Sequence, residues 1–166
     1  MAEVQRTYPE QFNERDLFVL ELEKPEDFPE QLALSSPRFA CLLVWDARES
    51  DEVRVGQLAR KLLSAGAVYI CIWGPDCRRV HEIIGRTPVA AAPAPVGRVA
   101  VTSGDAKVPL AEAIWDILYG SVPDEAFAAS CGSTVGITIG LPARAAEVRA
   151  AFKDPIGFNA RLVHPS

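Results

Sequence analysis

The sequence lacks the features that mark several large classes of protein. It has no basic run longer than a pair such as Arg78-Arg79, and Lys and Arg number 17 against 22 Asp and Glu. Nucleic-acid binders usually carry a basic face that neutralises phosphates, so we expect no DNA or RNA partner. No apolar run approaches the roughly 18–20 residues that cross a bilayer, so we expect no membrane partner.

Secretion signals and paired cysteines are also missing. Residues 1–16 carry charges of both signs and lack the apolar core, about 7–15 residues long, of a secretory signal. Two of the four cysteines, Cys41 and Cys71, fall within apolar runs, where a reduced cysteine behaves as a small hydrophobe. We therefore expect a cytoplasmic protein with reduced thiols and no Cys71–Cys77 disulfide.

Motifs of nucleotide-binding and hydrolytic enzymes are absent. The chain has no GxGxxG, no GxxxxGK[ST] and no GxSxG, and only two histidines are available for a triad. There is no CxxC pair, and zinc normally takes four ligands. We predict no cofactor and no metal site.

What is present indicates one ordinary globular domain. The 166 residues are 49% hydrophobic and 23% charged, which favours a single globular domain over residues 1–166. We expect residues 1–15, a polar leader, and residues 154–166, a tail, to be less ordered. The net charge of -5 favours a basic or a small partner, although mild acidity is also common in soluble proteins.

Apolar runs alternate with amphipathic segments along the chain. Strands are expected at 16–23, 39–45, 67–73, 98–104 and 133–140, and helices at 51–65, 75–85, 108–122 and 142–153. Shorter helical pieces are expected at 30–34 and 123–131. This alternation predicts a three-layer Rossmann-like or flavodoxin-like sandwich, with a mainly parallel sheet of about 4–5 strands and helices on both faces.

Single residues refine these elements. Ser50 or Asp51 is expected to cap the first long helix, Gly66 to end it in a left-handed conformation, and Pro75 to open the next helix. Strand 98–104 is expected to be central. Gly136 indicates that strand 133–140 is an edge or a site of close backbone approach, and that strand is either parallel or an antiparallel edge.

The carboxyl ends of the strands are the expected place for a site, because ligands of open α/β sheets bind there. Loops 46–50, 74–77 and 102–106 place Asp46, Asp76, Ser103 and Asp105 at this edge. Trp45 and Trp73 end two of the strands. They are either core residues or, together with Ser103 and Asp105, contacts for a ligand.

Each acidic candidate has a structural alternative. Asp76 is expected in the first turn of a helix, where a carboxylate interacts favourably with free N–H groups and the helix dipole. A catalytic acid would need a partner and a raised pKa. Asp46 either begins a turn or contacts a metal or a ribose.

A strand-to-helix connection does not by itself require Cys77 and His81, so these two residues are candidates for a function. A helix N-terminus lowers the pKa of a thiol, and His81, four residues later, would lie on the same helical face. The pair would suit nucleophilic catalysis, or two ligands of a metal site that lacks the other ligands.

The order of motifs resembles a known type of domain. A strand ending in LVWD, a strand running into IWGPDC and a helix containing PLAEAIWDIL follow one another between Phe39 and Gly140. This resembles an uncharacterised family of small bacterial α/β domains of unknown function. The resemblance implies no activity, cofactor or catalytic residue.

Two functions follow from the sequence. The first is a non-catalytic α/β module that binds a protein partner or a small ligand, as an accessory, regulatory or immunity-type component. The second is a small hydrolase- or transferase-like enzyme that works at Asp46, Asp76 and Cys77. The missing catalytic motifs favour the first.

Overall fold

A computed structural model describes residues 2–88, 97–104 and 107–163. Within them, one six-stranded sheet has the order β1-β2-β6-β3-β4-β5. The strands are β1 (Gln5–Arg6), β2 (Asp16–Leu22), β3 (Arg38–Trp45), β4 (Ala67–Trp73), β5 (Ala100–Gly104) and β6 (Cys131–Ile139). β1 pairs antiparallel with β2, and all the other pairings are parallel.

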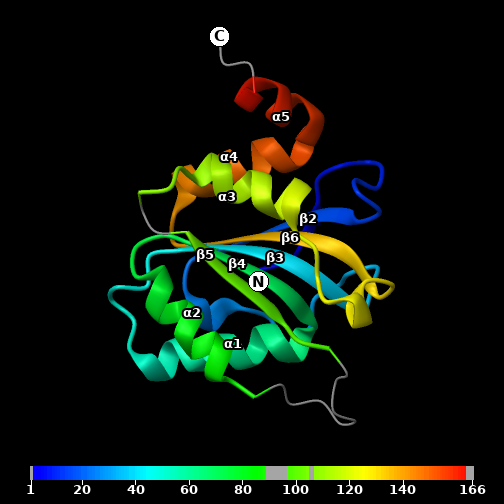
Figure 1. Cartoon of the computed structure of the whole chain (residues 1–166). Helices are drawn as coiled ribbons and strands as arrows, with labels where there is room; N and C mark the ends of the chain where they lie inside the picture. The colour runs from blue at the N-terminus through cyan, green and yellow to red at the C-terminus, as the bar shows by residue number, and fades with distance from the viewer. Residues whose placement is uncertain (1, 89–96, 105–106, 164–166) are drawn as a thin grey trace.

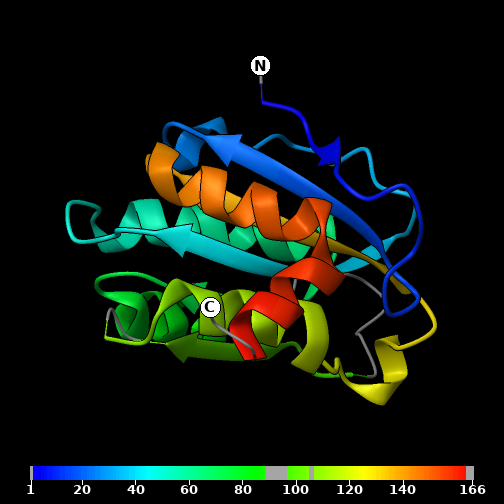
Figure 2. The ribbon, with the colours of Figure 1, turned by 90° about the horizontal axis from the view of Figure 1, so that it is seen from above.

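Helices cover both faces of this sheet (Figure 1). The helices are α1 (Glu52–Ala65), α2 (Cys77–Arg86), α3 (Leu110–Trp115), α4 (Pro142–Lys153) and α5 (Pro155–Val163). α1 and α2 lie below the sheet in Figure 1, and α3, α4 and α5 lie above it. Seen from above, α4 lies along β2, and it packs against β2 and β6 (Figure 2). The expected α/β class is confirmed, with more strands than the expected number.

Buried strands divide the apolar core into two layers. All of β4 is buried, as is β3 after Arg38, which is why both read as continuous apolar runs. Alternate side chains point to opposite faces. Cys41, Leu43 and Trp45 therefore join the core beneath α1 and α2, that is, between these helices and the sheet. Leu42 and Val44 join the core beneath α3 and α4, between those helices and the other face of the sheet.

β6 is central, with β2 on one side and β3 on the other. Of the two alternatives for this strand, it is parallel, and Gly136 marks a close approach and not an edge. A Cβ at Gly136 would lie 2.7 Å from Val148 Cγ1 and 3.1 Å from Phe152 Cζ on α4. The five parallel strands lie across the sheet in the order β2-β6-β3-β4-β5. If they are numbered 1 to 5 along the chain, this order is 1-5-2-3-4, which is neither of the two common doubly wound orders.

Several local expectations are confirmed. Asp51 caps α1, accepting a hydrogen bond from the backbone N–H of Arg54, and Gly66 ends that helix with a φ of 112°. Helix α4 begins and ends at the expected residues.

Other expectations are wrong. Pro75 does not open α2, which begins two residues later. β5 is an edge strand, because β4 is its partner and it stands last in the strand order. The helix expected at 108–122 is divided into α3 and the π-helical turn η2 (Asp116–Gly120), and the piece at 123–131 shortens to the 3-10 turn η3 (Glu125–Phe127).

Regular structure occurs in the described parts of both chain ends. The leader contains β1, and the tail contains α5, where Phe158 packs against the core beneath α3 and α4. The helical turn expected at 30–34 lies earlier, as the 3-10 turn η1 (Pro25–Asp27). None of the described helices is long and apolar enough to span a membrane.

Candidate functional site

The expected acid Asp46 is held by its neighbour Arg48. Its carboxylate accepts hydrogen bonds from Arg48 Nε at 2.9 Å and Arg48 Nη2 at 2.6 Å. These side-chain hydrogen bonds lower the pKa of Asp46, against the opposing effect of desolvation. A general acid needs a raised pKa at neutral pH, so this environment suits an ionised turn residue.

Arg79 joins the loops that follow β3 and β4. Its guanidinium donates hydrogen bonds of 2.7 Å to the carbonyl oxygens of Ala47 and Ser50 and to the carboxylate of Asp76. Asp76 precedes α2 with a left-handed φ of 67°, and its side chain makes no capping hydrogen bond. The expected role of Asp76 as a helix-capping carboxylate is therefore wrong, since its partner is Arg79.

Gly74 lets these two loops approach one another. It has a φ of +134°, and a Cβ there would lie 2.1 Å from the carbonyl oxygen of Trp45. The N–H of Ala47 also donates to the carbonyl of Pro75 at 3.4 Å. We call the loops 46–50 and 74–77, together with Arg79, the tied half of the sheet's carboxyl end.

Cys77 and His81 have different surroundings. The Cys77 side chain is buried, and its Sγ donates to the carbonyl of Gly104 at 2.9 Å. His81 Nδ1 lies 3.0 Å from the Oγ of Ser103, which belongs to the edge strand β5. A nucleophilic thiol must be accessible to its substrate, and the buried position of Cys77 does not provide this access.

The tryptophans at the strand ends lie on opposite faces. Trp45 belongs to the core beneath α1 and α2, and Trp73 to the core beneath α3 and α4. They cannot form one wall of a pocket. Trp73 donates to the Val108 carbonyl at 2.7 Å, and the Arg144 guanidinium lies over its ring. Asp105, the remaining expected contact, lies outside the described residues.

The other cysteines are structural. All four cysteines are buried, and none forms a disulfide with another described residue. Burial raises the pKa of the Cys41 and Cys131 thiols and raises the pKa of Cys71 to about 11. Such thiols stay protonated at neutral pH and are poor nucleophiles. Within the described part of the chain, no group of three or more His, Cys, Asp or Glu side chains could hold a metal ion.

A second region of the carboxyl end is open. β2 and β3 continue into connections that contribute to the core beneath α1 and α2, whereas β6 continues into α4 on the other face. A crevice is expected where adjacent parallel strands lead to opposite faces. Hollows of about 520 Å³ and about 490 Å³ adjoin the end of β2 and share Glu21, Leu22 and Glu23 in their linings.

A third hollow, of about 610 Å³, continues from these along residues 29–33 and shares Ala2 and Asp27 with its neighbour. We call the three together the acidic groove. The described residues that line it include no Lys or Arg, and its carboxylates are those of Glu3, Glu21, Glu23, Asp27 and Glu30.

Some of these carboxylates have partners. Glu21 pairs with Arg149 of α4, and Glu30 lies 4.0 Å from Lys61. Asp27 accepts a hydrogen bond from the backbone N–H of Lys24. The structure gives no such partner for Glu3 or Glu23 among the described residues. The groove thus presents net negative charge to solvent.

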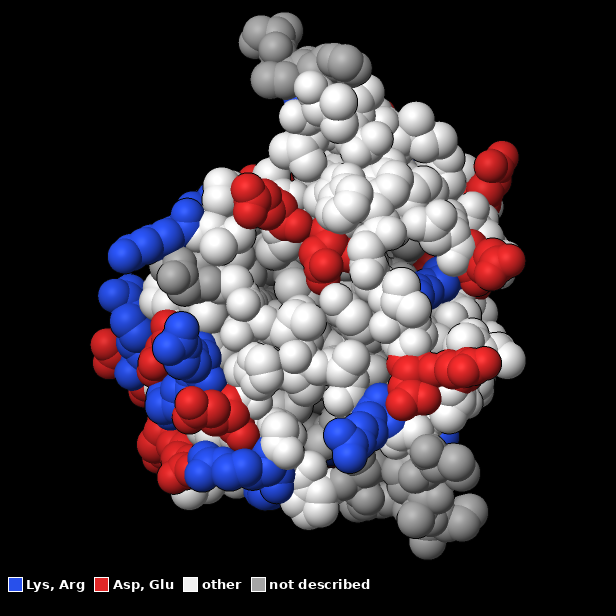
Figure 3. Space-filling view, viewed as in Figure 1, with Lys and Arg blue, Asp and Glu red and all other residues white. Residues whose placement is uncertain are grey.

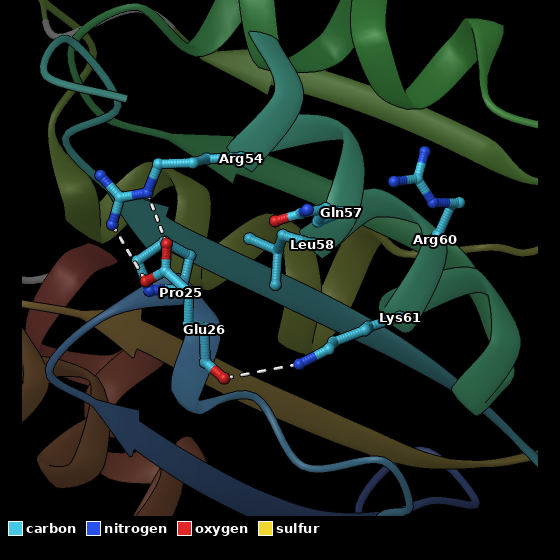
Figure 4. Close-up of a pocket in the computed structure, with 7 residues that line it drawn as sticks. All are labelled: Pro25, Glu26, Arg54, Gln57, Leu58, Arg60 and Lys61. Atoms are coloured by element: carbon cyan, nitrogen blue, oxygen red, sulfur yellow. Dashed lines mark hydrogen bonds and ion pairs between the residues drawn. The ribbon is translucent and has the colours of Figure 1, made fainter. Parts of the chain in front are cut away.

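A further hollow of about 310 Å³ lies between η1 and α1 (Figure 4). Three of its charged side chains bind other groups of the chain: Arg54 pairs with Glu26, and Lys61 donates to the carbonyls of Glu26 and Phe28. Figure 4 shows Arg60 pointing away from this ion pair. We interpret this hollow as the seam that fixes the β2–β3 connection to α1.

These features define a three-layer α/β domain whose predicted catalytic residues hold loops together. The comparisons agree on a domain without an assigned activity: the family model described as a domain of unknown function, DUF7684, matches residues 17–155. Because the match spans most of the chain, this protein belongs to that family, and the predicted resemblance to a family of unknown function is confirmed. A search of curated proteins finds no match.

Sequence reasoning missed the acidic groove. Its carboxylates are far apart in the chain, from Glu3 to Glu30, and only Glu23 directly follows a buried strand. The one available signal was Glu21-Leu22-Glu23 at the end of the first strand. Its meaning depends on β6 lying beside β2, which is a long-range pairing.

Proposed function

We propose that this chain is a non-catalytic α/β module whose acidic groove binds a basic, extended segment of a protein partner. The observation that carries the proposal is the lining of the groove, with five carboxylates and neither Lys nor Arg among its described residues. Complementary charge speeds encounter and selects the partner.

The backbone beside the groove supports an extended partner. β1 pairs with β2 only at Val19 and Phe18, so the described strands leave Leu20–Leu22 paired on one side only, with β6. An extended peptide can add to such a strand through main-chain hydrogen bonds, while its Lys or Arg side chains meet Glu21 and Glu23. A cytoplasmic setting belongs to this proposal and is supported by the absence of disulfides among the described residues.

Calorimetric titration with a Lys- and Arg-rich peptide tests the proposal, with a Glu-rich peptide of equal length as the negative probe. Neutralising two unpartnered groove carboxylates, in Glu3→Gln with Glu23→Gln, should weaken binding about tenfold. Glu82→Gln with Glu125→Gln, two exposed carboxylates outside the groove lining, is the matched control and should have little effect.

Two outcomes would overturn the proposal: no binding of the basic peptide at low salt, or equal affinity in both double variants. A polyamine supplies positive charge without a peptide backbone. Tighter binding of the polyamine than of the peptide would move the proposal from a protein partner to a small basic ligand.

The enzymatic alternative has its own test. If the Asp46, Asp76 and Cys77 edge were catalytic, Cys77 would react with a thiol probe faster than the other cysteines. Because Cys77 is 4% exposed and bonded to Gly104, we expect no such preference in the folded protein. Selective labelling of Cys77, with loss of an activity on alkylation, would favour the enzyme.

A further inference from the structure

β5 stands at one edge of the sheet formed by the described strands. β5 pairs with β4 in an unbroken register from Tyr69↔Ala100 to Trp73↔Gly104, and it is last in the strand order. Among the described residues, no strand pairs with its other side. The backbone N–H and C=O groups on the free side of such a strand are a template for pairing with a second chain.

β5 lacks the features that usually protect an edge. Its sequence, Ala-Val-Thr-Ser-Gly, has no charged residue and no proline, and its register contains no bulge. The opposite edge of the sheet is different: β1 has only two residues, and Arg6 on it pairs with Asp16. Short, charged edges prevent unwanted pairing, and long uncharged edges permit it.

The middle of the face that carries β5 is also uncharged. Figure 3 shows a broad area without Lys, Arg, Asp or Glu across the middle of this face, with charged side chains gathered at its margins. Thr102 and Ser103 are exposed on β5, and Val101 is partly buried against the core.

We infer that this edge pairs with the β5 edge of a second copy of the chain. Two copies that each carry a net charge of -5 repel one another over most approaches. An uncharged face is where this repulsion is smallest, and uncharged residues can lie opposite their own copies without like-charge contacts. The inference is independent of the acidic groove, whose charge favours a different, basic partner.

Symmetry fixes the geometry of this pairing. A closed pair of identical chains has a two-fold axis, so the two β5 strands run antiparallel and one residue lies opposite its own copy. Full overlap of the five-residue strands places Thr102 on the axis. Directly opposed Cα atoms in antiparallel strands are about 4.5–5.5 Å apart, within the range that a disulfide spans.

The area of contact limits the strength of the dimer. A stable interface buries about 800 Å² on each partner, which exceeds what a five-residue strand can supply alone. The flanking surfaces of α2 and α3 therefore take part, and we expect a dimer that dissociates on dilution.

Sedimentation equilibrium over a range of concentrations tests the inference. Thr102→Lys with Ser103→Lys places like charges along the paired edges and should weaken the dimer at least about tenfold. The matched control is Val53→Lys with Val122→Lys, at two residues that are 64% and 78% exposed outside β5, and it should leave the dimer unchanged. Circular dichroism verifies that both variants fold.

A cross-linking experiment tests the register. Thr102→Cys should form a disulfide-linked dimer on mild oxidation, and Ser64→Cys, exposed on α1, should not. A monomer at every concentration would overturn the inference, as would a dimer that Thr102→Lys with Ser103→Lys leaves intact. The groove variant Glu3→Gln with Glu23→Gln should dimerise normally, so failure of one proposal is distinguishable from failure of the other.

Discussion

The two halves of the sheet's carboxyl end use the same strand geometry differently. In the tied half, Arg79 bonds to Ala47, Ser50 and Asp76, and Gly74 packs against the backbone of Trp45. At the acidic groove, the ends of β2 and β6 border open hollows.

The direction in which each connection leaves the sheet accounts for the difference. β3 and β4 both lead to helices on the same face, α1 and α2, so their loops pack together and satisfy one another's polar groups. β6 leads to α4 on one face of the sheet, and the connection that follows β2 lies on the opposite face. The two connections therefore leave a gap between the ends of β2 and β6. Polar residues after a buried strand therefore do not identify a binding site unless the neighbouring connections diverge.

The largest effect should come from breaking the close approach in the tied half. Gly74→Ala places a Cβ 2.1 Å from the Trp45 carbonyl oxygen in a left-handed backbone conformation. We expect a loss of about 3 kcal/mol or more in the free energy of unfolding, measured by urea denaturation. Gly85→Ala, near the C-terminal end of α2 and with nothing within 4 Å of the added Cβ, is the control and should stabilise by at most about 0.5–1 kcal/mol. Equal behaviour of the two variants would contradict the structure here.

Removing Arg79 should have the next largest effect. Arg79→Ala leaves the carbonyls of Ala47 and Ser50, both buried residues, without this donor, at a cost of about 2–3 kcal/mol. Arg149→Ala removes only the exposed pair with Glu21 and should cost less than about 1 kcal/mol. If denaturant midpoints showed the same loss for both arginines, the distinction between the tied half and the groove would be lost.

An intermediate effect is expected where α4 packs against β6 beside the groove. Gly136→Ala introduces a Cβ 2.7 Å from Val148 Cγ1 and should cost about 1–2 kcal/mol through overpacking. Val148→Ala removes the opposing methyl groups, so a double-mutant cycle should show that the two losses are not additive. Strict additivity would mean that α4 does not lie on Gly136 as described.

The smallest effect concerns the seam between η1 and α1. The hydrogen bond from Arg54 lowers the pKa of Glu26 to about 2 from its usual 4.5. The stabilisation is complete above pH 4.5 and is lost as the pH falls towards 2, because the unfolded chain takes up the proton first. Glu26 is 47% exposed, so Glu26→Gln should lower the free energy of unfolding by less than about 1 kcal/mol at pH 7. The variant should also lose less of that free energy than the parent protein as the pH falls from 4.5 towards 2. The same pH dependence of the free energy of unfolding in both proteins would show that the pair of Arg54 and Glu26 does not stabilise the fold.

Local features of the fold could be predicted from the sequence. Asp51 and Gly66 were identifiable as the ends of α1 because capping depends on neighbouring residues. The strands over 39–45 and 67–73 were identifiable from continuous apolar runs. The place of β6 was not, since its pairing with β2 and β3 joins residues about a hundred positions apart, and no local pattern records strand order.

The candidate site was less predictable for the same reason. Cys77 and His81 lie on one helix, α2, but the burial of Cys77 against Gly104 decides how accessible its thiol is. Asp76 could be placed at the start of α2, whereas its ion pair with Arg79 depends on a left-handed backbone at Asp76 itself. Sequence patterns located these residues and left their partners undetermined.

The central position of β6 has a consequence for folding. β2 and β3 both border β6, and until residues 131–139 join the sheet neither has its full set of neighbours. Strand pairings over such long sequence separations form slowly, because closing a long loop costs entropy before any contact is gained. During synthesis, β3, β4 and β5 can associate early with α1 and α2, while β2 must wait for the last strand. A chain interrupted before Cys131 would therefore expose the inner edges of β2 and β3 together, and should be the form most prone to aggregate.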